Sequence, residues 1–246
     1  MAILWQKRVG DTLYEVRTAG RSRRLYANGV FHSQYHPQRP HAGGVWDLLM
    51  LPAFFRPPAR IRRILVLGVG GGTVIHLLRR FVQPAEIVGV ELNPVHLQVA
   101  RQFFDIREDM ARLHQADAVQ WLNDYQGPPF DMIIDDLFGN GDIDQGRAVP
   151  ADTAWCSTLL GNLRRNGVLV MNFIGNAALR DSACVSDPRI ARHFKSAFRL
   201  SLPAYENAIG AFLGHPASSQ GLRRNLARIP ELSSRHIDFR IRRIGP

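Results

Sequence analysis

The chain has 246 residues, of which 46% are hydrophobic and 21% are charged. This is enough apolar side chain to bury a full core in one large domain, or in a domain with a small appendage. No stretch of about 18 consecutive apolar residues occurs, which excludes a membrane-spanning helix. The first residues lack an apolar segment before their first charges, which argues against a signal peptide. We therefore expect a globular, cytoplasmic protein.

The net charge is +10, from 31 Lys and Arg against 21 Asp and Glu. Such an excess can attract nucleic acid or another polyanion. The arginines, however, occur as scattered pairs without aromatic residues between them, and segment 222–246 adds a basic C-terminal tail. Because scattered charge is a weak indication of a polyanion site, we favour a solvated surface and do not favour nucleic acid as a partner.

The first predicted elements along the chain are strands. Segments 13–20 and 23–35 are short and rich in β-forming residues, and segment 45–55 predicts a short apolar helix. Pro57-Pro58 then marks a boundary. We therefore predict a small N-terminal β unit with a short helix over residues 1–58, which must pack on the part that follows.

From residue 61 on, strands and helices alternate. Strands are predicted at 61–68, 86–91, 112–117, 130–136 and 167–174, and helices at 74–81, 93–104, 117–124, 151–165 and 187–197. Apolar runs at 198–205 and 207–215 predict a closing antiparallel hairpin. The pattern predicts an α/β fold over 59–246, a doubly wound, Rossmann-like, mostly parallel sheet that binds its ligand at the carboxyl ends of the strands.

The most informative motif is the glycine-rich turn that follows strand 61–68. Gly68, Gly70 and Gly72 allow a sharp turn there and let a ligand approach the backbone. Glu91 ends the next strand, where an acid can accept hydrogen bonds from both ribose hydroxyls of a nucleoside. Thr73 stands where the dinucleotide fingerprint needs Gly or Ala, so we do not favour NAD.

Further acids end the third and fourth strands of the alternating part. Asp117-Ala118 is placed to contact an adenine amino group, and Asp135-Asp136 ends strand 130–136. Adjacent strand residues point to opposite faces, so only one of these two aspartates can face the cleft. Each acid alone could be a helix N-cap or a loop residue. Four such features at successive strand ends predict an adenosine-binding cleft.

The segment ILVLGVGGGTVIHLL, with IVGVELNPVHLQVARQFF, HQADAVQWL and FDMIIDDLF after it, resembles the class I S-adenosylmethionine-dependent methyltransferase fold. More narrowly, the segments LYANGVFHSQY, NGVLVMNF and LPAYENAIGAFLGH resemble the spermidine synthase (polyamine aminopropyltransferase) branch of that fold. The resemblance covers about residues 12–215. It implies a transferase that uses S-adenosylmethionine or its decarboxylated form.

The resemblance also implies roles for individual residues. The glycine turn, Glu91, Asp117 and Ala118 match the nucleoside side of the family's site. Asp136 matches the aspartate that accepts a proton, and Tyr205 matches an active-site tyrosine, which we expect to orient the acceptor.

On the amine side of the site the sequence departs from that family. Gly71 stands where the family has the acid that holds the aminopropyl ammonium, Gly139 replaces a second acid, and His32 replaces a glutamine. Ammonium groups are costly to desolvate unless carboxylates pair with them. We therefore favour methyl transfer to an amine-type small-molecule acceptor. The alternatives are a polyamine aminopropyltransferase that makes spermidine-like products, and a non-catalytic nucleoside-binding module.

We expect no metal site. His32 and His36 are spaced like a metal pair but lie among strand and turn residues, so we favour an ordinary exposed pair. The two cysteines, Cys156 and Cys184, have no histidine nearby in the sequence that would activate a thiol nucleophile. We expect the protein to be a homodimer.

Overall fold

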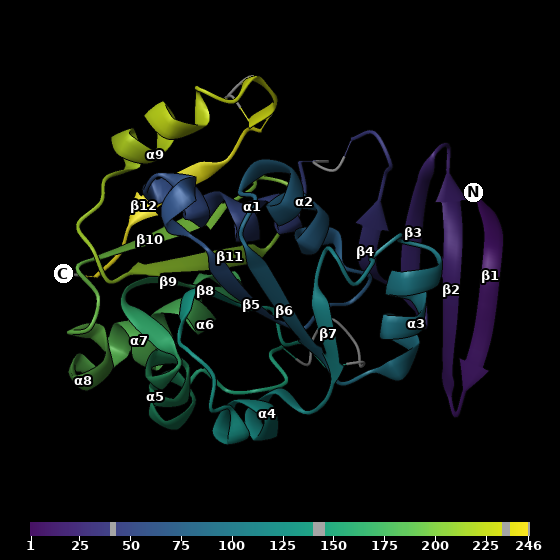
Figure 1. Ribbon diagram of the computed structural model, residues 1–246, viewed down its shortest axis with the longest axis horizontal. Coiled ribbons are helices and arrows are strands. Elements are labelled where there is room, and N and C mark those ends of the chain that lie inside the picture. The colour runs from purple at the N-terminus through teal and green to yellow at the C-terminus, as the bar shows by residue number, and fades with distance from the viewer. Residues whose placement is uncertain (40–42, 140–145, 233–236, 246) are drawn as a thin grey trace.

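The computed structural model describes residues 1–39, 43–139, 146–232 and 237–245, and two separate β-sheets form within them (Figure 1). The N-terminal sheet is an antiparallel meander in the order β1 (Ala2–Val9), β2 (Thr12–Ala19), β3 (Ser22–Ala27) and β4 (Val30–Tyr35). Strand β1 was not predicted. Nearly all of its side chains are exposed on both faces, so it lacks the alternation of a half-buried strand.

The second sheet has eight strands in the order β12-β10-β11-β9-β8-β5-β6-β7. Its bounds are β5 (Arg63–Leu67), β6 (Glu86–Glu91), β7 (Arg112–Gln115), β8 (Phe130–Asp135), β9 (Leu163–Ile174), β10 (Ser196–Ser201), β11 (Asn207–Leu213) and β12 (Arg240–Arg243). Strands β5 to β9 pair in parallel, while β10 to β12 join antiparallel. The predicted mostly parallel sheet with a C-terminal hairpin is confirmed.

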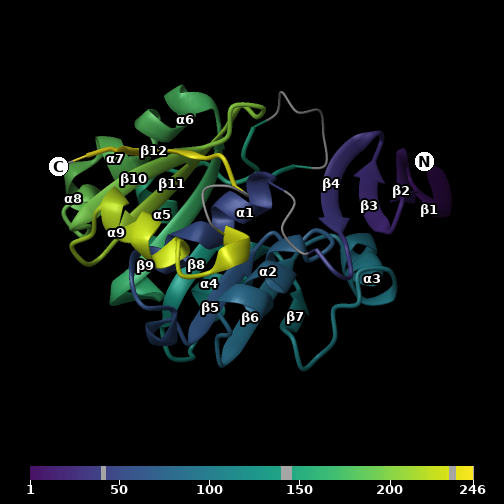
Figure 2. The ribbon, with the colours of Figure 1, turned by 90° about the horizontal axis from the view of Figure 1, so that it is seen from above.

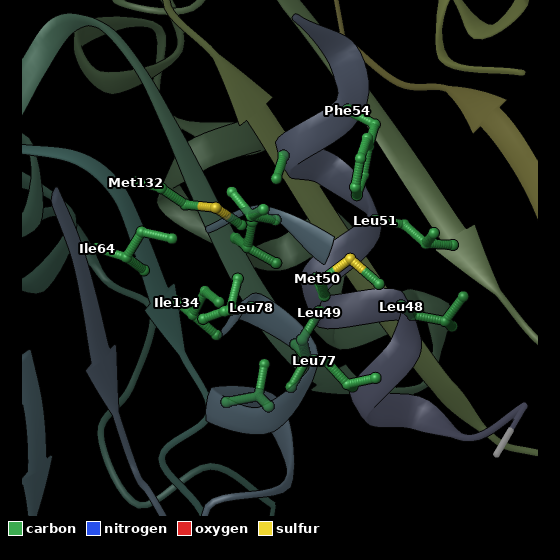
Figure 3. Packing of buried hydrophobic residues seen from close by; sticks show 14 of the residues in the cluster. Leu48, Leu49, Met50, Leu51, Phe54, Ile64, Leu77, Leu78, Met132 and Ile134 are labelled. Atoms are coloured by element: carbon green, nitrogen blue, oxygen red, sulfur yellow. The ribbon is translucent and has the colours of Figure 1, made fainter. Parts of the chain in front are cut away.

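Helices cover both faces of this sheet. Along β5, Ile64 and Val66 pack into one hydrophobic cluster, and Leu65 and Leu67 into the other, because successive strand residues point to opposite faces. The first cluster includes α1 (Val45–Met50), α2 (Thr73–Phe81) and α9 (Ser219–Leu226), and Figure 3 shows part of it. The second cluster includes α4 (Ala118–Asp124), α5 (Thr153–Gly161), α6 (Gly175–Asp181) and α7 (Ala183–Ser186).

The N-terminal sheet is joined to the larger part through α3 (Pro94–Gln102) and the glycine turn (Figure 2). Val16 and Leu25 of the meander pack on Val99 and Phe104 at α3. Helix α1, by contrast, is buried in the core of the large sheet. The boundary between units at residue 58 therefore stays a prediction, although α1 packs with the second unit.

Several elements differ from their predicted extent. The predicted helix 45–55 is α1 followed by a 3-10 turn, Leu51–Phe55, which contains Pro52 near its start. Strand β9 begins at Leu163, so the predicted helix 151–165 is shorter. The predicted helix 187–197 is only a single turn, α8 (Pro188–Ala191), with β10 beginning at Ser196.

In the tail, residues 240–243 form the edge strand β12, which the sequence did not predict. Segment 140–145 of the loop after β8 lies outside the described residues. Among the helices that are described, none is long and apolar enough to cross a membrane.

Candidate active site

The glycine turn lies between β5 and α2. After this turn the chain forms β6 and β7 on one side of β5, and it then crosses to form β8 on the other side. Gly68, Gly70 and Gly72 all have positive φ angles, of 81°, 54° and 88°. A Cβ on Gly68 would collide with the carbonyl oxygen of Asp136 at the end of β8. Glycine is therefore required where β5 and β8 end side by side, and in an open sheet such a switch point in strand order is where ligands bind.

Glu91 lies beside this turn and holds its backbone. Its Oε2 accepts hydrogen bonds from the N–H groups of Val69 and Gly70, at 3.0 and 2.8 Å, and its Oε1 accepts one from the N–H of Asn93 at 2.9 Å. Burial acts to raise the pKa of Glu91, but the nearby His96 and these N–H donors outweigh it, so the pKa lies below its ordinary value. An ionised carboxylate thus stands at the position predicted for ribose binding.

The space next to Gly71 is closed. A Cβ added at this residue would lie 2.8 Å from both Phe104 Cε1 and Ser33 Cβ, and the Gly71 N–H donates to Ser33 Oγ at 2.7 Å. An acidic side chain at position 71 would therefore have to displace a buried phenylalanine or the docked β4 strand. The loss of the family's acid here is accompanied by packing that fills its place.

Asp117 caps helix α4. Its Oδ1 accepts from the N–H groups of Val119 and Gln120 at 2.9 and 3.0 Å, and Ala118 is buried beneath. Capping uses one carboxylate oxygen, and the residue lies at the carboxyl end of β7. The predicted contact of Asp117 and Ala118 with adenine stays a prediction.

Asp136 follows β8 and is half-buried. Its Oδ1 accepts a hydrogen bond from Asn172 Nδ2 on β9 at 2.7 Å, and Asn172 Oδ1 accepts from Asn207 Nδ2 on β11 at 3.0 Å. Loss of hydration raises the pKa of Asp136 to about 6; the Asn172 hydrogen bond acts against this rise and the charge of Asp135 adds to it. Asp136 is thus an oriented carboxylate of raised basicity.

Its neighbour Asp135 is fully buried on the opposite face and is already paired. Asp135 Oδ2 accepts from Arg147 at 2.6 Å and from Trp155 Nε1 at 2.8 Å. Arg147 also donates to the backbone carbonyls of Val149 and Asn172. Asp135 therefore ties the end of the loop after β8 to the sheet, and Asp136 is the aspartate available for chemistry.

Tyr205 lies near the start of β11 and is 43% exposed. Its hydroxyl and the Trp46 ring are both within 4 Å of the position that a Cβ on Gly44 would take. Phe31 packs edge-on against Trp46, with ring centroids 5.2 Å apart. These aromatic side chains lie together on the side where an acceptor is expected, and the role of Tyr205 stays a prediction.

The structure thus gathers the glycine turn, Glu91 and Asp136 around the ends of β5, β6 and β8. Sequence reasoning missed Asn172 and Arg147. Asn172 could have been found, because a polar residue inside the apolar run VLVMNFI must have a buried partner. Leu92, 66% exposed directly after Glu91, is also an apolar surface at this edge. Among the described residues, no group of three or more His, Cys, Asp or Glu side chains could hold a metal ion.

Comparison with solved structures shows the class of fold. A probable spermidine synthase from Corynebacterium glutamicum superimposes with a TM-score of 0.72 at 20% identity, over 92% of this chain and 88% of that one. Human methyltransferase-like protein 13 in complex with SAH superimposes with a TM-score of 0.61, also at 20% identity, over 76% of this chain and 90% of that one. The chain therefore has the fold of class I S-adenosylmethionine-dependent methyltransferases and spermidine synthases.

Curated relatives fall into the same two groups. The eEF1A lysine and N-terminal methyltransferase homolog of Drosophila melanogaster is 25% identical over 119 residues, which are 45% of this chain and 17% of the relative. The polyamine aminopropyltransferase of Vibrio vulnificus is 30% identical over 125 residues, 48% of this chain and 40% of the relative. The matches thus span less than half of these relatives, and no family model matches the chain. The resemblance identified from the sequence is confirmed.

Proposed function

We propose that this chain is a transferase that binds S-adenosylmethionine at the carboxyl ends of β5, β6 and β8 and transfers its methyl group to an amine. The observation that carries the proposal is Asp136, a half-buried carboxylate with a pKa near 6, which Asn172 orients at the end of β8. The nearby glycine turn and Glu91 supply the features that a nucleoside needs. Relatives named as methyltransferases and aminopropyltransferases support an amine acceptor, either a protein lysine or N-terminus or a small polyamine.

The residues have a limited chemical task. When bound, a sulfonium nucleoside supplies an electrophilic carbon next to a neutral thioether leaving group. The amine nitrogen forms the new bond to carbon, and the carbon–sulfur bond breaks with its electron pair staying on sulfur. An alkylamine is mostly protonated at pH 7, so one proton must leave the nitrogen before attack. Asp136 accepts that proton, and its raised pKa makes it a better base than an ordinary aspartate.

Two observations favour methyl over aminopropyl transfer. The position of Gly71 is closed by Phe104 and Ser33, so no carboxylate stands there to pair with the ammonium of the decarboxylated nucleoside. Gly139 offers no second acid. Sequence relatives named as polyamine aminopropyltransferases support the alternative, in which the same base would serve a diamine.

Product analysis decides between these activities. The purified chain is incubated with S-adenosylmethionine or its decarboxylated form, and with either putrescine or a lysine-containing peptide. We expect mass spectrometry to find a methylated amine in the reactions that contain S-adenosylmethionine. We also expect calorimetry to show that S-adenosylmethionine binds at least as tightly as its decarboxylated form. Aminopropylated putrescine, with a tenfold preference for the decarboxylated nucleoside, would establish the alternative. Binding without any product would favour a non-catalytic module.

Glu91→Ala should weaken binding of methylthioadenosine by about 2–4 kcal/mol, as expected for buried hydrogen bonds to a charged group. The same change should also lower the melting temperature, because three backbone N–H groups lose their acceptor. Asp152→Ala, which removes the carboxylate that caps α5 by accepting from the Trp155 N–H at 2.8 Å, is the control for a loss of stability alone. Affinity that stays unchanged in a folded Glu91→Ala protein would place the nucleoside elsewhere.

A further inference from the structure

The carboxylate of Glu91 has little hydrogen-bonding capacity left. An ionised carboxylate offers about four acceptor positions, two on each oxygen. The N–H groups of Val69 and Gly70 occupy both positions on Oε2, and the N–H of Asn93 occupies one on Oε1. His96 Nδ1 faces Oε1 at 3.6 Å, too far for a hydrogen bond. Without breaking a bond to its own backbone, Glu91 can therefore accept from one ribose hydroxyl and not from both.

A second polar atom, on a ring close enough to this carboxylate to be influenced by its charge, has no hydrogen-bond partner among the described residues. The ring of His32, on β4, packs against that of His96, with centroids 5.2 Å apart. It also interacts electrostatically with the carboxylate of Glu91. The Nε2 of His32 is buried and has no hydrogen-bond partner among the described residues. Leaving a buried nitrogen unpaired destabilises a fold, so such an atom indicates a missing partner, and the Nε2 of the neighbouring His96 is likewise buried without one among the described residues.

The protonation state of His32 is compatible with binding a hydroxyl. Burial, together with the neighbouring His96, lowers the pKa of His32 to about 4, so the ring is neutral at pH 7. A neutral imidazole has one donor and one acceptor nitrogen, and a ribose hydroxyl can meet either. The carbonyl oxygen of His32 lies 3.5 Å from the Cβ position of Gly70, which places this strand directly against the glycine turn.

We propose that the two ribose hydroxyls are divided between two residues, with Glu91 Oε1 binding one and His32 Nε2 binding the other. This inference rests on the proposed binding of an adenosyl nucleoside, and it does not depend on which group is transferred. His96, which is 4% exposed, acts as a positioning residue because it packs against both the His32 ring and Tyr14. The proposal thus assigns His32 to the ribose side of the site instead of the amine side where the resemblance places it, and the N-terminal sheet completes a site otherwise built by the larger sheet.

The test is a thermodynamic cycle between protein and ligand. Calorimetry measures the binding of 5′-methylthioadenosine and of its 2′-deoxy and 3′-deoxy analogues to wild type and to His32→Phe. We expect His32→Phe to bind methylthioadenosine about fivefold to tenfold more weakly, as for one lost neutral hydrogen bond. One deoxy analogue, which lacks the hydroxyl that His32 holds, should bind both proteins equally. The other should show the full loss.

Two controls keep the cycle interpretable. His36→Phe changes a histidine beyond the end of β4 whose Nδ1 already accepts from the N–H groups of Gln38 and Arg39, and it should leave all three affinities unchanged. If His32→Phe does not fold, the smaller His32→Asn, in which the short amide cannot reach as far, replaces it in the same cycle.

The outcomes separate this inference from the proposed function. Equal weakening of all three ligands, or no weakening of any, would show that His32 acts by packing or not at all, and the division of hydroxyls would be wrong. A wild-type protein that binds none of the three nucleosides would instead refute nucleoside binding, and the proposed function with it.

Discussion

Asp136→Asn is expected to reduce turnover by a factor of about 10²–10⁴ while the chain stays folded and at least as stable as wild type at pH 7. The amide oxygen of an asparagine can still accept the hydrogen bond that Asn172 donates to Asp136 at 2.7 Å. It cannot accept a proton from an amine. Steady-state kinetics and urea unfolding of the two proteins test both parts, and methylthioadenosine should bind both equally.

The pH dependence gives the sign of the stability effect. The pKa of Asp136 rises from an ordinary 3.8 to about 6 in the folded chain, so the folded state binds more protons between these values. The contribution of Asp136 to the free energy of unfolding is therefore most favourable at low pH and falls as pH rises from about 4 to 6. The stability gained in Asp136→Asn should grow over this interval to at most about 3 kcal/mol. The actual gain should be smaller, because a half-buried carboxylate keeps part of its hydration.

The catalytic activity should also depend on the protonation of Asp136, but it should rise with pH, whereas the contribution of Asp136 to stability falls. The wild-type rate should fall as pH drops through about 6, because protonated Asp136 cannot act as a base. A stability difference between wild type and Asp136→Asn that does not change with pH would contradict the raised pKa. Full turnover in Asp136→Asn would favour a different base or a binding module.

Unlike Asp136→Asn, the Asp135→Asn change should destabilise the fold. We expect a loss of about 3–5 kcal/mol in the free energy of unfolding, because breaking a buried ion pair leaves a charge uncompensated. The Arg147 side chain is only 7% exposed and its partner carboxylate is fully buried. Urea unfolding measures the loss. Asp109→Asn is the control, because its pair with Arg107 is exposed and screened by water, so this change should leave the stability nearly unchanged.

Two results would contradict this assignment of faces. A loss below about 1 kcal/mol in Asp135→Asn would mean that Arg147 does not depend on it. A folded Asp135→Asn protein that binds methylthioadenosine normally but turns over as slowly as Asp136→Asn would mean that Asp135 takes part in the chemistry.

The cleft could be predicted because its main residues follow from strand order. Gly68, Glu91 and Asp136 each end or follow a buried parallel strand, and the carboxyl ends of such strands meet at one edge of a sheet. Apolar runs and turn residues indicated those strands without any knowledge of tertiary contacts. Because adjacent strand residues point to opposite faces of a sheet, the sequence also indicated that only one of Asp135 and Asp136 could face the cleft.

The other features depend on contacts between distant segments, which no local pattern encodes. His32 meets His96 and Ser33 meets Gly71 only because the N-terminal sheet docks on α3 and the turn. Local propensity also misplaced the start of β9: residues 163–166 favour a helix by composition, but Leu163 pairs with Phe130 of β8, and the pairing resumes at Val168 after a shift in register. Tertiary pairing overrides propensity at such positions.

The two edge strands of the large sheet are short, and both carry some of the arginines that make the chain basic. Both edges, β7 and β12, are only four residues long, and both expose arginine: Arg112 on β7, and Arg240, Arg242 and Arg243 on β12. An open sheet edge carries unpaired N–H and C=O groups that can pair with the edge of another molecule and begin aggregation. Arg112 is paired with Glu86 at 3.5 Å, so the positive charge is concentrated on β12, where three exposed arginines on a four-residue edge act against pairing with the same edge of a second copy.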